Sequence, residues 1–372
     1  MSFCLQPCLP TAWEKIGAIL EPQSKSEGDY IQNFTNVAQP LDDKKWRLWY
    51  SVSSLQAAYK IAVAEGIPGK PMVRHHAVLS EGEPLDAPLS IGNLPAGWNP
   101  VQPVYVKLPD GRDRLYFWAH GPGVVRYLAA ESSDGRHYRV LDPHRAVLYH
   151  CNDRAAIGVK TVEGLTLGPS WGERPKADEP IAPAEIICND ATNVYLLPDG
   201  TWELYSPGLI SVEPGDPRYV AHDNAAGWVR VIDRWTSDDG LLWGNRKRVI
   251  VPDENDPHDM QFYHLSVTHT PQGRVGMLGH YRVEAQTMDI EWCFSQDGIH
   301  WDRPYRYGWL LRGENGEADC YGVYPPNSLV YHNGYWWLFY TGVNHAHNHK
   351  HTFGTQRSII LAAKTKSIWE SQ

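Results

Sequence analysis

The stretches "ESSDGRHYRV" (131–140), "TSDDGLLWGN" (236–245) and "FSQDGIHWDR" (294–303) repeat one pattern, Ser-x-Asp-Gly-x-x followed by an aromatic residue. Glycine supplies the positive φ of a tight turn, and short Ser and Asp side chains accept hydrogen bonds from turn amides. Each copy follows an apolar run typical of a strand. A pattern that returns three times in this setting indicates a repeated structural unit, and we expect its role to be structural.

Five further stretches each combine a strand, a tight turn and a second strand: 37–51, 104–118, 193–206, 265–280 and 327–342. A third strand follows every hairpin, and in three units it runs into the Ser-x-Asp-Gly turn, after which an outer strand is expected. Long amphipathic helical patterns are absent from the sequence. Five units of four strands, on the order of 70 residues each, predict an all-β, five-bladed β-propeller with four-stranded antiparallel blades.

The two ends of the chain complement each other in this scheme. The fifth unit has no outer strand of its own, whereas "WEKIGAILEP" (13–22) is similar to the outer strands of other units. We therefore expect residues 11–22 to close the ring by completing the last blade, which removes the exposed sheet edges. The Pro- and Gly-rich ranges 67–98 and 142–184 are expected to be loops, so that residues 1–372 form a single domain.

Composition narrows the class of function. The net charge is −9, which argues against nucleic acid as a partner. No apolar run reaches the ~18 residues of a membrane helix, and the N-terminus shows no leader pattern, so we expect a cytoplasmic protein and no membrane partner. The chain has 16 Trp and 20 Tyr but only 7 Phe, and such amphipathic aromatics suit sugar-binding clefts. The six Cys show no zinc spacing and are expected to be reduced thiols.

The repeated turns "SSDGRHY", "SDDGLLW" and "SQDGIHW", together with the aligned hairpins, resemble those of the five-bladed propeller glycosidases, which include glycoside hydrolase families 32, 43, 68, 117 and 130 and uncharacterised relatives. The resemblance covers nearly the whole chain. It implies a site in a central funnel, built from the first strand of each blade, where three acidic residues usually perform the chemistry. This chain has no "NDPNG" motif, and no acidic triple matches residue by residue.

Candidate catalytic residues come from the segments that lead into the first strands. Asp190 follows the apolar "IIC" (186–188), where a buried carboxylate is costly unless it is paired or used; capping a turn is its alternative role. Asp259 precedes His264 on the same segment, and it could instead belong to a solvated acidic loop. Asp29 and Asp319 occupy the same position when the first and fifth units are aligned, and a structural role is the alternative for this symmetry. The predicted catalytic residues are thus Asp190, Asp259, His264 and Asp29, with carboxylates or a histidine as the proton donor.

Other polar residues are expected at the same rim of the ring and are predicted to bind substrate: Asn33, Asn99, Gln102, His120, Glu185, His280, Arg282, Tyr321, Tyr324 and His345. We expect no metal in the site and no cofactor. A structural or axial metal ion is an alternative, because "NHAHNHKH" (344–351) is rich in histidine.

These observations predict a glycoside hydrolase that acts from the chain end of a small oligosaccharide, since a cytoplasmic address favours a transported oligosaccharide over a polymer. Two alternatives stay open: a glycoside phosphorylase of the same fold, which needs a basic phosphate pocket, and a propeller that binds carbohydrate without catalysis. The oligomeric state is open, and a homodimer is one alternative.

Overall fold

The computed structural model describes residues 6–7, 13–22, 30–32, 34, 36–53, 59–76, 78–79, 89–153, 161–162, 165–166, 187–188, 190–223, 226–306, 312–349 and 357–370. These residues form strands and turns, with one 3-10 helix, η4 (His347–His349), and the predicted all-β class is confirmed. Among them no helix has the length and apolar character needed to span a membrane.

The first two units follow the predicted hairpin plan. The first sheet contains β3 (Tyr30–Ile31), β4 (Val37–Pro40), β5 (Trp46–Ser53), β6 (Lys60–Gly66) and β7 (Val73–His76); β3 and β4 both pair with β5. The second contains β10 (Asn99–Lys107), β11 (Asp113–Gly121), β12 (Val124–Ser132) and β13 (His137–Val140). It is extended by β8 (Val78–Leu79), β9 (Ser90–Gly92), β14 (Leu148–His150) and β17 (Ile187–Cys188).

The later units repeat the plan with one difference. The third sheet contains β18 (Asn193–Leu196), β19 (Trp202–Ser211), β20 (Trp228–Ser237) and β21 (Gly244–Ile250). The fourth unit, β22 (Met260–Thr270), β23 (Gly273–Arg282) and β24 (Thr287–Ser295), is joined through β25 (Gly322–Tyr324) to the fifth, β26 (Val330–His332), β27 (Tyr335–Val343) and β28 (Ser358–Thr365). The expected outer strand of the fourth unit is reduced, among the described residues, to a bridge between Phe294 and Asp302.

The chain ends and the long insertions complete the arrangement. The N-terminal strand β2 (Glu14–Leu20) pairs antiparallel with β28, from Glu14 opposite Lys364 to Leu20 opposite Ile360. Two small sheets pair β1 (Gln6–Pro7) with β29 (Trp369–Glu370) and β15 (Thr161–Val162) with β16 (Leu165–Thr166). Both ranges that we expected to be loops contain strands: 67–98 contributes β7, β8 and β9, and 142–184 contributes β14, β15 and β16. These strands are two to four residues long, too short for a clear alternating pattern.

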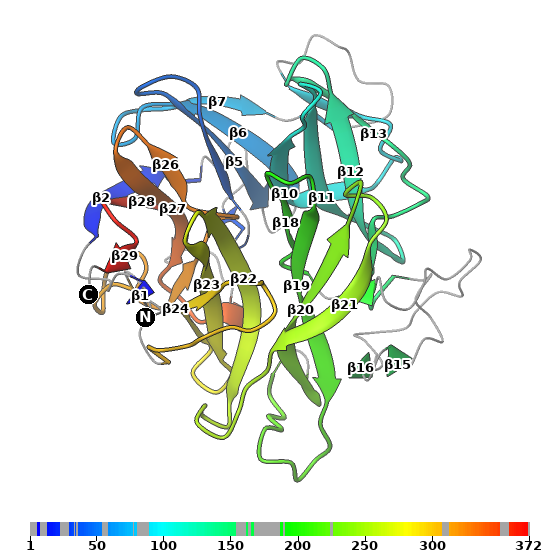
Figure 1. Ribbon diagram of the computed structural model, residues 1–372, viewed down its shortest axis with the longest axis vertical. Coiled ribbons are helices and arrows are strands. Elements are labelled where there is room, and N and C mark those ends of the chain that lie inside the picture. The colour runs from blue at the N-terminus through cyan, green and yellow to red at the C-terminus, as the bar shows by residue number, and fades with distance from the viewer. Residues whose placement is uncertain are drawn as a thin grey trace.

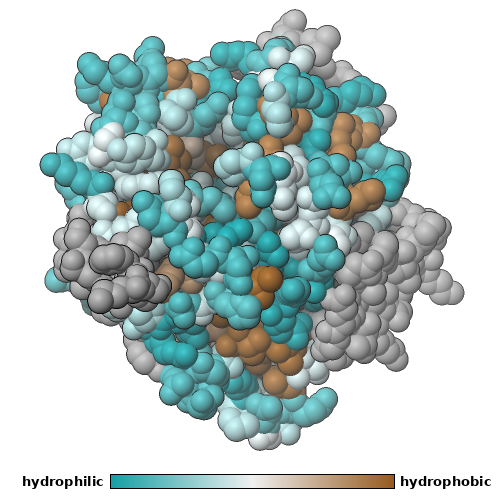
Figure 2. Space-filling model, in the orientation of Figure 1, coloured by the Kyte–Doolittle hydropathy of each residue, from teal (hydrophilic) through white to brown (hydrophobic). Residues whose placement is uncertain are grey.

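The sheets stand around the middle of the molecule, and the first strands β10, β18 and β22 lie nearer to it than the outer strands β13 and β21 (Figure 1). Hydrophobic side chains fill the spaces between neighbouring sheets; one cluster, for example, joins Trp49 of β5 with Phe117 of β11. Another joins Trp46 of the first sheet with Phe339 and Ile360 of the fifth. On the face shown in Figure 2, hydrophobic residues form small groups separated by hydrophilic ones.

The Ser-x-Asp-Gly turns have the structural role expected from the sequence. Ser132 Oγ accepts a hydrogen bond from the Gly135 amide at 3.0 Å, and Asp134 Oδ1 accepts two more from the following amides. Hydrogen bonds from the side chain and amide of His137 hold the pKa of Asp134 well below its usual range. Gly135, Gly240 and Gly298 all adopt a positive φ of 70–76°, which is why glycine occupies this position in every copy.

Each of these turns also contacts the sheet of the preceding unit. The Gly135 carbonyl accepts a hydrogen bond from Arg47 of β5, and the Gly240 carbonyl accepts one from the Tyr116 hydroxyl of β11 at 2.9 Å. The Gly298 carbonyl accepts one from Tyr205 of β19 at 3.5 Å. The repeated motif therefore joins neighbouring sheets as well as closing its own turn.

Candidate functional site

The two ends of the first strands differ. We call the end where these strands begin the strand-start end, and the end where they turn into the second strand the hairpin end. At the strand-start end, Asp190 lies three residues before the first residue of β18, and Asp259 immediately precedes β22. At the hairpin end lie the tight turns of the hairpins and the Ser-x-Asp-Gly turns. The predicted catalytic residues within the described chain thus lie before a first strand, as Asp190 and Asp259 do, or in its strand-start half, as His264 does in β22.

Segments from four units meet in the centre of the molecule. The Asn327 amide donates to the Asn36 carbonyl at 2.9 Å, and Asn327 Nδ2 donates to Asn193 Oδ1 at 3.0 Å. Asn193 Nδ2 donates in turn to the Leu265 carbonyl at 3.0 Å. These buried amides fix the first strands relative to one another, which a site built from several strands requires.

Asp190 is half-buried at this centre, and two tyrosines lie close enough for its charge to act on them. Burial and, after it, the negative charge of Asp190 raise the pKa of the Tyr59 hydroxyl, and the same two causes lead the increase for Tyr263. Both phenols therefore keep their protons at neutral pH. A protonated phenol next to a carboxylate is a hydrogen-bond donor for it. Tyr59 also packs edge-on against the predicted binding residue His120, with ring centroids 5.3 Å apart.

A buried aromatic cluster lies beside Asp190. Phe34 stacks on Tyr263 at 4.9 Å and meets Tyr324 edge-on at 5.0 Å. The ring of His347 lies 5.1 Å from both Tyr263 and Tyr281, and its Nδ1 is 2.7 Å from the Tyr324 hydroxyl. The predicted binding residue Tyr324 is thus a buried part of this cluster, which forms a rigid support next to the carboxylate.

A buried arginine also contacts the Tyr263 ring. The Arg230 guanidinium lies 4.6 Å from the centre of this ring, on which Phe34 stacks as well. Its charge is balanced by Asp223 at 2.9 Å, and Gln261 Oε1 accepts a further hydrogen bond from it. Cation–π contact and ring stacking together leave Tyr263 little freedom.

His264 is the predicted catalytic residue with the most unusual surroundings. Its side chain is buried, with 2% exposure, and neither ring nitrogen makes a hydrogen bond within the described part of the chain. Burial, with a smaller contribution from His280, lowers the pKa of His264 to about 3. The imidazole is therefore neutral at neutral pH. A neutral imidazole buried without a partner is costly by about 1–3 kcal/mol per polar group, so it is a candidate for contact with a bound molecule.

Asp259 and Arg282, predicted as a catalytic and a binding residue, form an ion pair with each other. Arg282 Nη2 lies 2.7 Å from Asp259 Oδ1, and Asp259 is only 1% exposed, whereas the Arg282 side chain is 37% exposed. The Glu284 amide donates to the second carboxylate oxygen. In this arrangement Asp259 fixes the end of β23, and its carboxylate is already engaged.

The remaining predicted binding residues occupy different surroundings. Asn99 pairs with His120 across β10 and β11, whereas His280 is buried and hydrogen-bonded to Glu291 inside the fourth unit. Tyr321 is exposed, and His345 is buried with its ring 5.6 Å from Tyr30. The structure thus brings Asn99 and His120 to the strand-start end but directs His280 into a sheet interface.

Three predicted residues, Asp29, Asn33 and Glu185, lie outside the described residues. In the described part of the chain, no group of three His, Cys, Asp or Glu side chains could hold a metal ion. The alternative of a metal ion at 344–351 stays a prediction, because residues 350–351 are not among those described.

The sequence analysis missed Tyr59 and Tyr263, which lie near Asp190, and the residues that hold Tyr263, namely Phe34, Arg230 and Asp223. The sequence does contain a pattern that points to Arg230. Arg126 and Arg230 are each the third residue of their strand, in "VVR" and "WVR", and each is paired with a buried aspartate, Asp153 and Asp223. A repeated arginine in an apolar strand indicates a buried ion pair.

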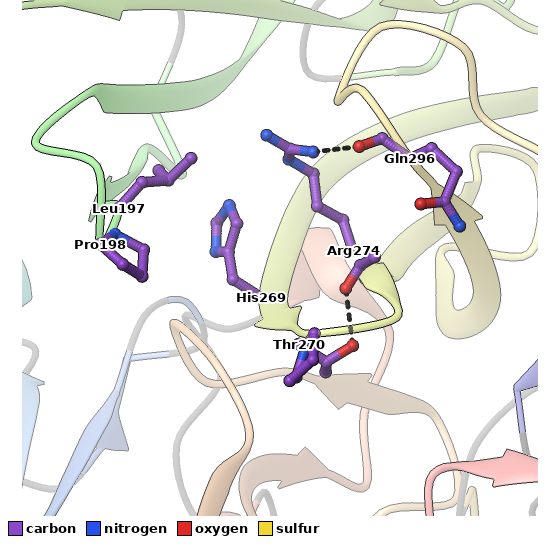
Figure 3. Close-up of a pocket in the computed structure, with 8 residues that line it drawn as sticks. Leu197, Pro198, His269, Thr270, Arg274 and Gln296 are labelled. Atoms are coloured by element: carbon purple, nitrogen blue, oxygen red, sulfur yellow. Dashed lines mark hydrogen bonds between the residues drawn. The ribbon is translucent and has the colours of Figure 1, made fainter.

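The pocket shown in Figure 3, with a volume of about 410 Å³, lies at the hairpin end and not at the candidate site. It is lined by Leu197 and Pro198 of one hairpin turn, by His269 and Arg274 of β22 and β23, and by Gln296 of a Ser-x-Asp-Gly turn. His269 and Arg274 both bind Glu203, at 2.9 and 2.6 Å. Their polar atoms are thus committed to a buried network that joins the third and fourth units.

No family model matches the chain, and no curated protein matches its sequence. Solved structures do match its fold over nearly the full length. A family-43 glycoside hydrolase described as thermostable is 11% identical, with a TM-score of 0.54 and coverage of 90% of both chains. A structure from work on glycoside hydrolase family 130, described as mannoside phosphorylases that include hydrolases of β-1,2-mannosidic linkages, is 13% identical. Its TM-score is 0.53, with coverage of 97% of this chain and 95% of that one.

An N-acetylgalactosamine deacetylase from F. plautii, solved with blood group B trisaccharide, matches with 15% identity and a TM-score of 0.54. The match covers 97% of this chain and 95% of the deacetylase. At these identities the likeness concerns the fold. The resemblance to the propeller glycoside hydrolase superfamily, stated from the repeated turns, is confirmed at that level.

Proposed function

We propose that this chain is a glycosidase-type enzyme that cleaves a glycosidic bond at the strand-start end, acting from the end of a small oligosaccharide. The observation that carries the proposal is the position of Asp190: a half-buried carboxylate at the centre of the molecule, near the phenols of Tyr59 and Tyr263. The fold shared with glycoside hydrolases agrees with it.

The proposed architecture is a five-bladed propeller closed by the N-terminal strand. Two contacts between the ends of the chain support closure: β2 pairs with β28, and the first and fifth units share a hydrophobic cluster that includes Trp46 and Phe339. Asn36 Nδ2 also donates to Thr341 Oγ1 across the same junction, at 3.3 Å. A closed ring places the starts of all first strands around one axis, which gives a single shared site.

The proposed chemistry assigns Asp190 the role of base or nucleophile. Glycoside hydrolysis needs this group and a proton donor on the other side of the bond. His264 is neutral at neutral pH, so its role is to contact the substrate with its unused ring nitrogens and not to supply an imidazolium proton. Asp259 is held by Arg282. Asp29 is therefore the proton donor that we favour among the predicted carboxylates.

A phosphorylase is the second candidate, favoured by the partly exposed Arg282 at the strand-start end and by the likeness to the family-130 structure. A cation at the rim of a site can bind phosphate. In the apo arrangement Arg282 is paired with Asp259, so phosphate would have to compete with that carboxylate.

The test is a substrate screen with the full-length protein. Aryl glycosides and short oligosaccharides, including N-acetylhexosamine sugars, are incubated with and without phosphate, and released sugar, sugar phosphate and acetate are measured. Sugar release that does not require phosphate supports the proposal. Strict dependence on phosphate would establish the phosphorylase, release of acetate alone would establish a deacetylase, and sugar binding by calorimetry without any product would establish a binding module.

A further inference from the structure

Two residues at the strand-start end have a backbone conformation that their side chains disfavour. Gln102, in β10, has φ +59°, and Ala191, next to Asp190, has φ +51°. Residues other than glycine are uncommon at positive φ, and Asn is the usual exception. Of the other four described non-glycine residues with positive φ, three are Asn. Gln102 and Ala191, by contrast, lie at the centre of the molecule and are not Asn. Left-handed backbone of this kind costs on the order of 1–3 kcal/mol per residue and clusters at functional sites.

The two residues are bonded directly to each other. The Ala191 amide donates to Gln102 Oε1 at 2.9 Å, and the Gln102 amide donates to Ser51 Oγ of the first sheet at 2.7 Å. Gln102 also lies in a bulge of β10, where the register with β11 shifts between Val101 and Val104. A bulge changes the direction of a side chain, and here it lets the side chain of Gln102 in the second sheet reach the Ala191 amide before the third.

This contact fixes the peptide group that follows Asp190. The N–H of that peptide belongs to Ala191 and is held by Gln102, whereas its carbonyl belongs to Asp190 and accepts a hydrogen bond from Ser206 Oγ at 3.3 Å. Ser206 is held in turn by Thr192 at 2.9 Å. Both polar atoms of one peptide are therefore restrained, which restricts the direction in which the Asp190 side chain leaves the backbone.

We infer that Gln102 is a positioning residue for Asp190: it accepts the Ala191 N–H and so maintains the left-handed turn that points the carboxylate into the site. This inference rests on the proposed function of Asp190. It also revises the expectation that Gln102 only binds substrate, since its side-chain oxygen is occupied by the Ala191 amide and the residue is 7% exposed. The side-chain amide of Gln102 is held through its oxygen, and its Nε2 makes no hydrogen bond within the described chain.

Two substitutions test the inference on a substrate that the wild-type protein cleaves. Gln102→Met keeps the length of the side chain but removes the acceptor. Gln102→Asn favours the left-handed backbone but is one methylene too short to reach Ala191. Both should lower kcat by about 10–100-fold with KM within about threefold. The matched control is Gln39→Met, which removes a glutamine of β4 that bonds Tyr105 at 3.3 Å, and it should retain wild-type kcat.

The decisive comparison combines each variant with Asp190→Asn. If Gln102 acts through Asp190, adding Gln102→Met to Asp190→Asn should lower kcat by less than about twofold, because the coupled effects are not additive. If Gln102→Met lowered the kcat of Asp190→Asn as strongly as it lowers the kcat of the wild-type protein, the inference would be wrong. It would also be wrong if the single Gln102 variants raised KM and left kcat unchanged. If Asp190→Asn itself retains turnover, the proposed function fails; if Asp190→Asn loses turnover while both Gln102 variants retain it, only the positioning role fails.

Discussion

The hairpin end and the strand-start end of the same strands differ in how far their residues repeat from unit to unit. At the hairpin end the same turn recurs three times, with Ser, Asp and Gly performing the same tasks and with a carbonyl bonded to the neighbouring sheet. At the strand-start end the units carry different residues: Gln102 in the second, Asp190 in the third and His264 in the fourth. Repetition at one end maintains the fold, whereas divergence at the other end supplies the residues of the proposed site.

Buried polar groups at the two ends show the same contrast. Glu203, near the hairpin end, receives hydrogen bonds from Arg234, Arg274 and His269, so its charge is fully compensated. His264, in the strand-start half of β22, is buried with both ring nitrogens unused in the described chain. Compensated groups contribute to structure, and uncompensated ones are candidates for contact with a bound molecule.

The largest effect on stability is expected from Glu203→Gln, which leaves the buried Arg234 and the half-buried Arg274 without their carboxylate. The free energy of unfolding should fall by about 4 kcal/mol, as measured by urea denaturation. Burial raises the pKa of Glu203, but hydrogen bonds from His269, Arg274 and Arg234 outweigh it and hold the pKa below the usual 4.5. The wild-type protein should therefore lose this contribution as the pH falls below about 4.5, and the variant should not.

The control for this variant is Glu254→Gln, at an exposed carboxylate. It should change the free energy of unfolding by less than about 0.5 kcal/mol. Equal effects of the two substitutions would contradict the structural role of the hairpin-end network.

A pair of glycine substitutions separates backbone strain from packing at the repeated turn. A Cβ at Gly298 would lie 2.5 Å from Tyr205 Oη and 3.0 Å from Arg234 Nε, whereas a Cβ at Gly200 would meet no atom within 4 Å. Both residues have positive φ. Gly298→Ala should cost about 3 kcal/mol and Gly200→Ala about 1 kcal/mol in thermal denaturation. Equal costs would show that the turn's contact with the neighbouring sheet adds nothing.

A smaller effect, confined to acid, is expected from His264. Burial keeps its pKa near 3 against 6.5 for an unperturbed histidine, so the unfolded chain binds a proton between these values that the folded protein does not. Stability should fall as the pH decreases from 6.5 to 3, with a slope of up to ~1.4 kcal/mol per pH unit from this residue. His264→Gln should flatten the slope, and His258→Gln, at an exposed histidine, should leave it unchanged. Parallel slopes for wild type and His264→Gln would refute this account.

The elements predicted correctly from the sequence are those specified by residues that lie close together along the chain. All five hairpins and the third strands that follow them are present, because turn residues and alternating apolar residues specify them within about 15 positions. The Ser-x-Asp-Gly turns could be interpreted for the same reason. The short strands β7 to β9 were missed, since two to four residues carry too little pattern.

The candidate site could be predicted only in part. Asp190 was identified from an apolar strand that precedes a carboxylate, which is a local signal. Its neighbours Tyr59 and Tyr263 come from other units, and no spacing in the sequence reveals that they meet. The ion pair between Asp259 and Arg282 depends on the hairpin register, and the role of Gln102 depends on a bulge. These features arise from contacts between strands, which a single sequence does not show.

The central claim, that chemistry occurs at the strand-start end around Asp190, is tested most directly by the turnover of Asp190→Asn. This substitution preserves size while removing the charge. With a substrate that the wild-type protein cleaves, kcat should fall by about 10²–10⁴-fold while the melting temperature stays within a few degrees. Near-normal turnover by a folded Asp190→Asn protein would contradict the account.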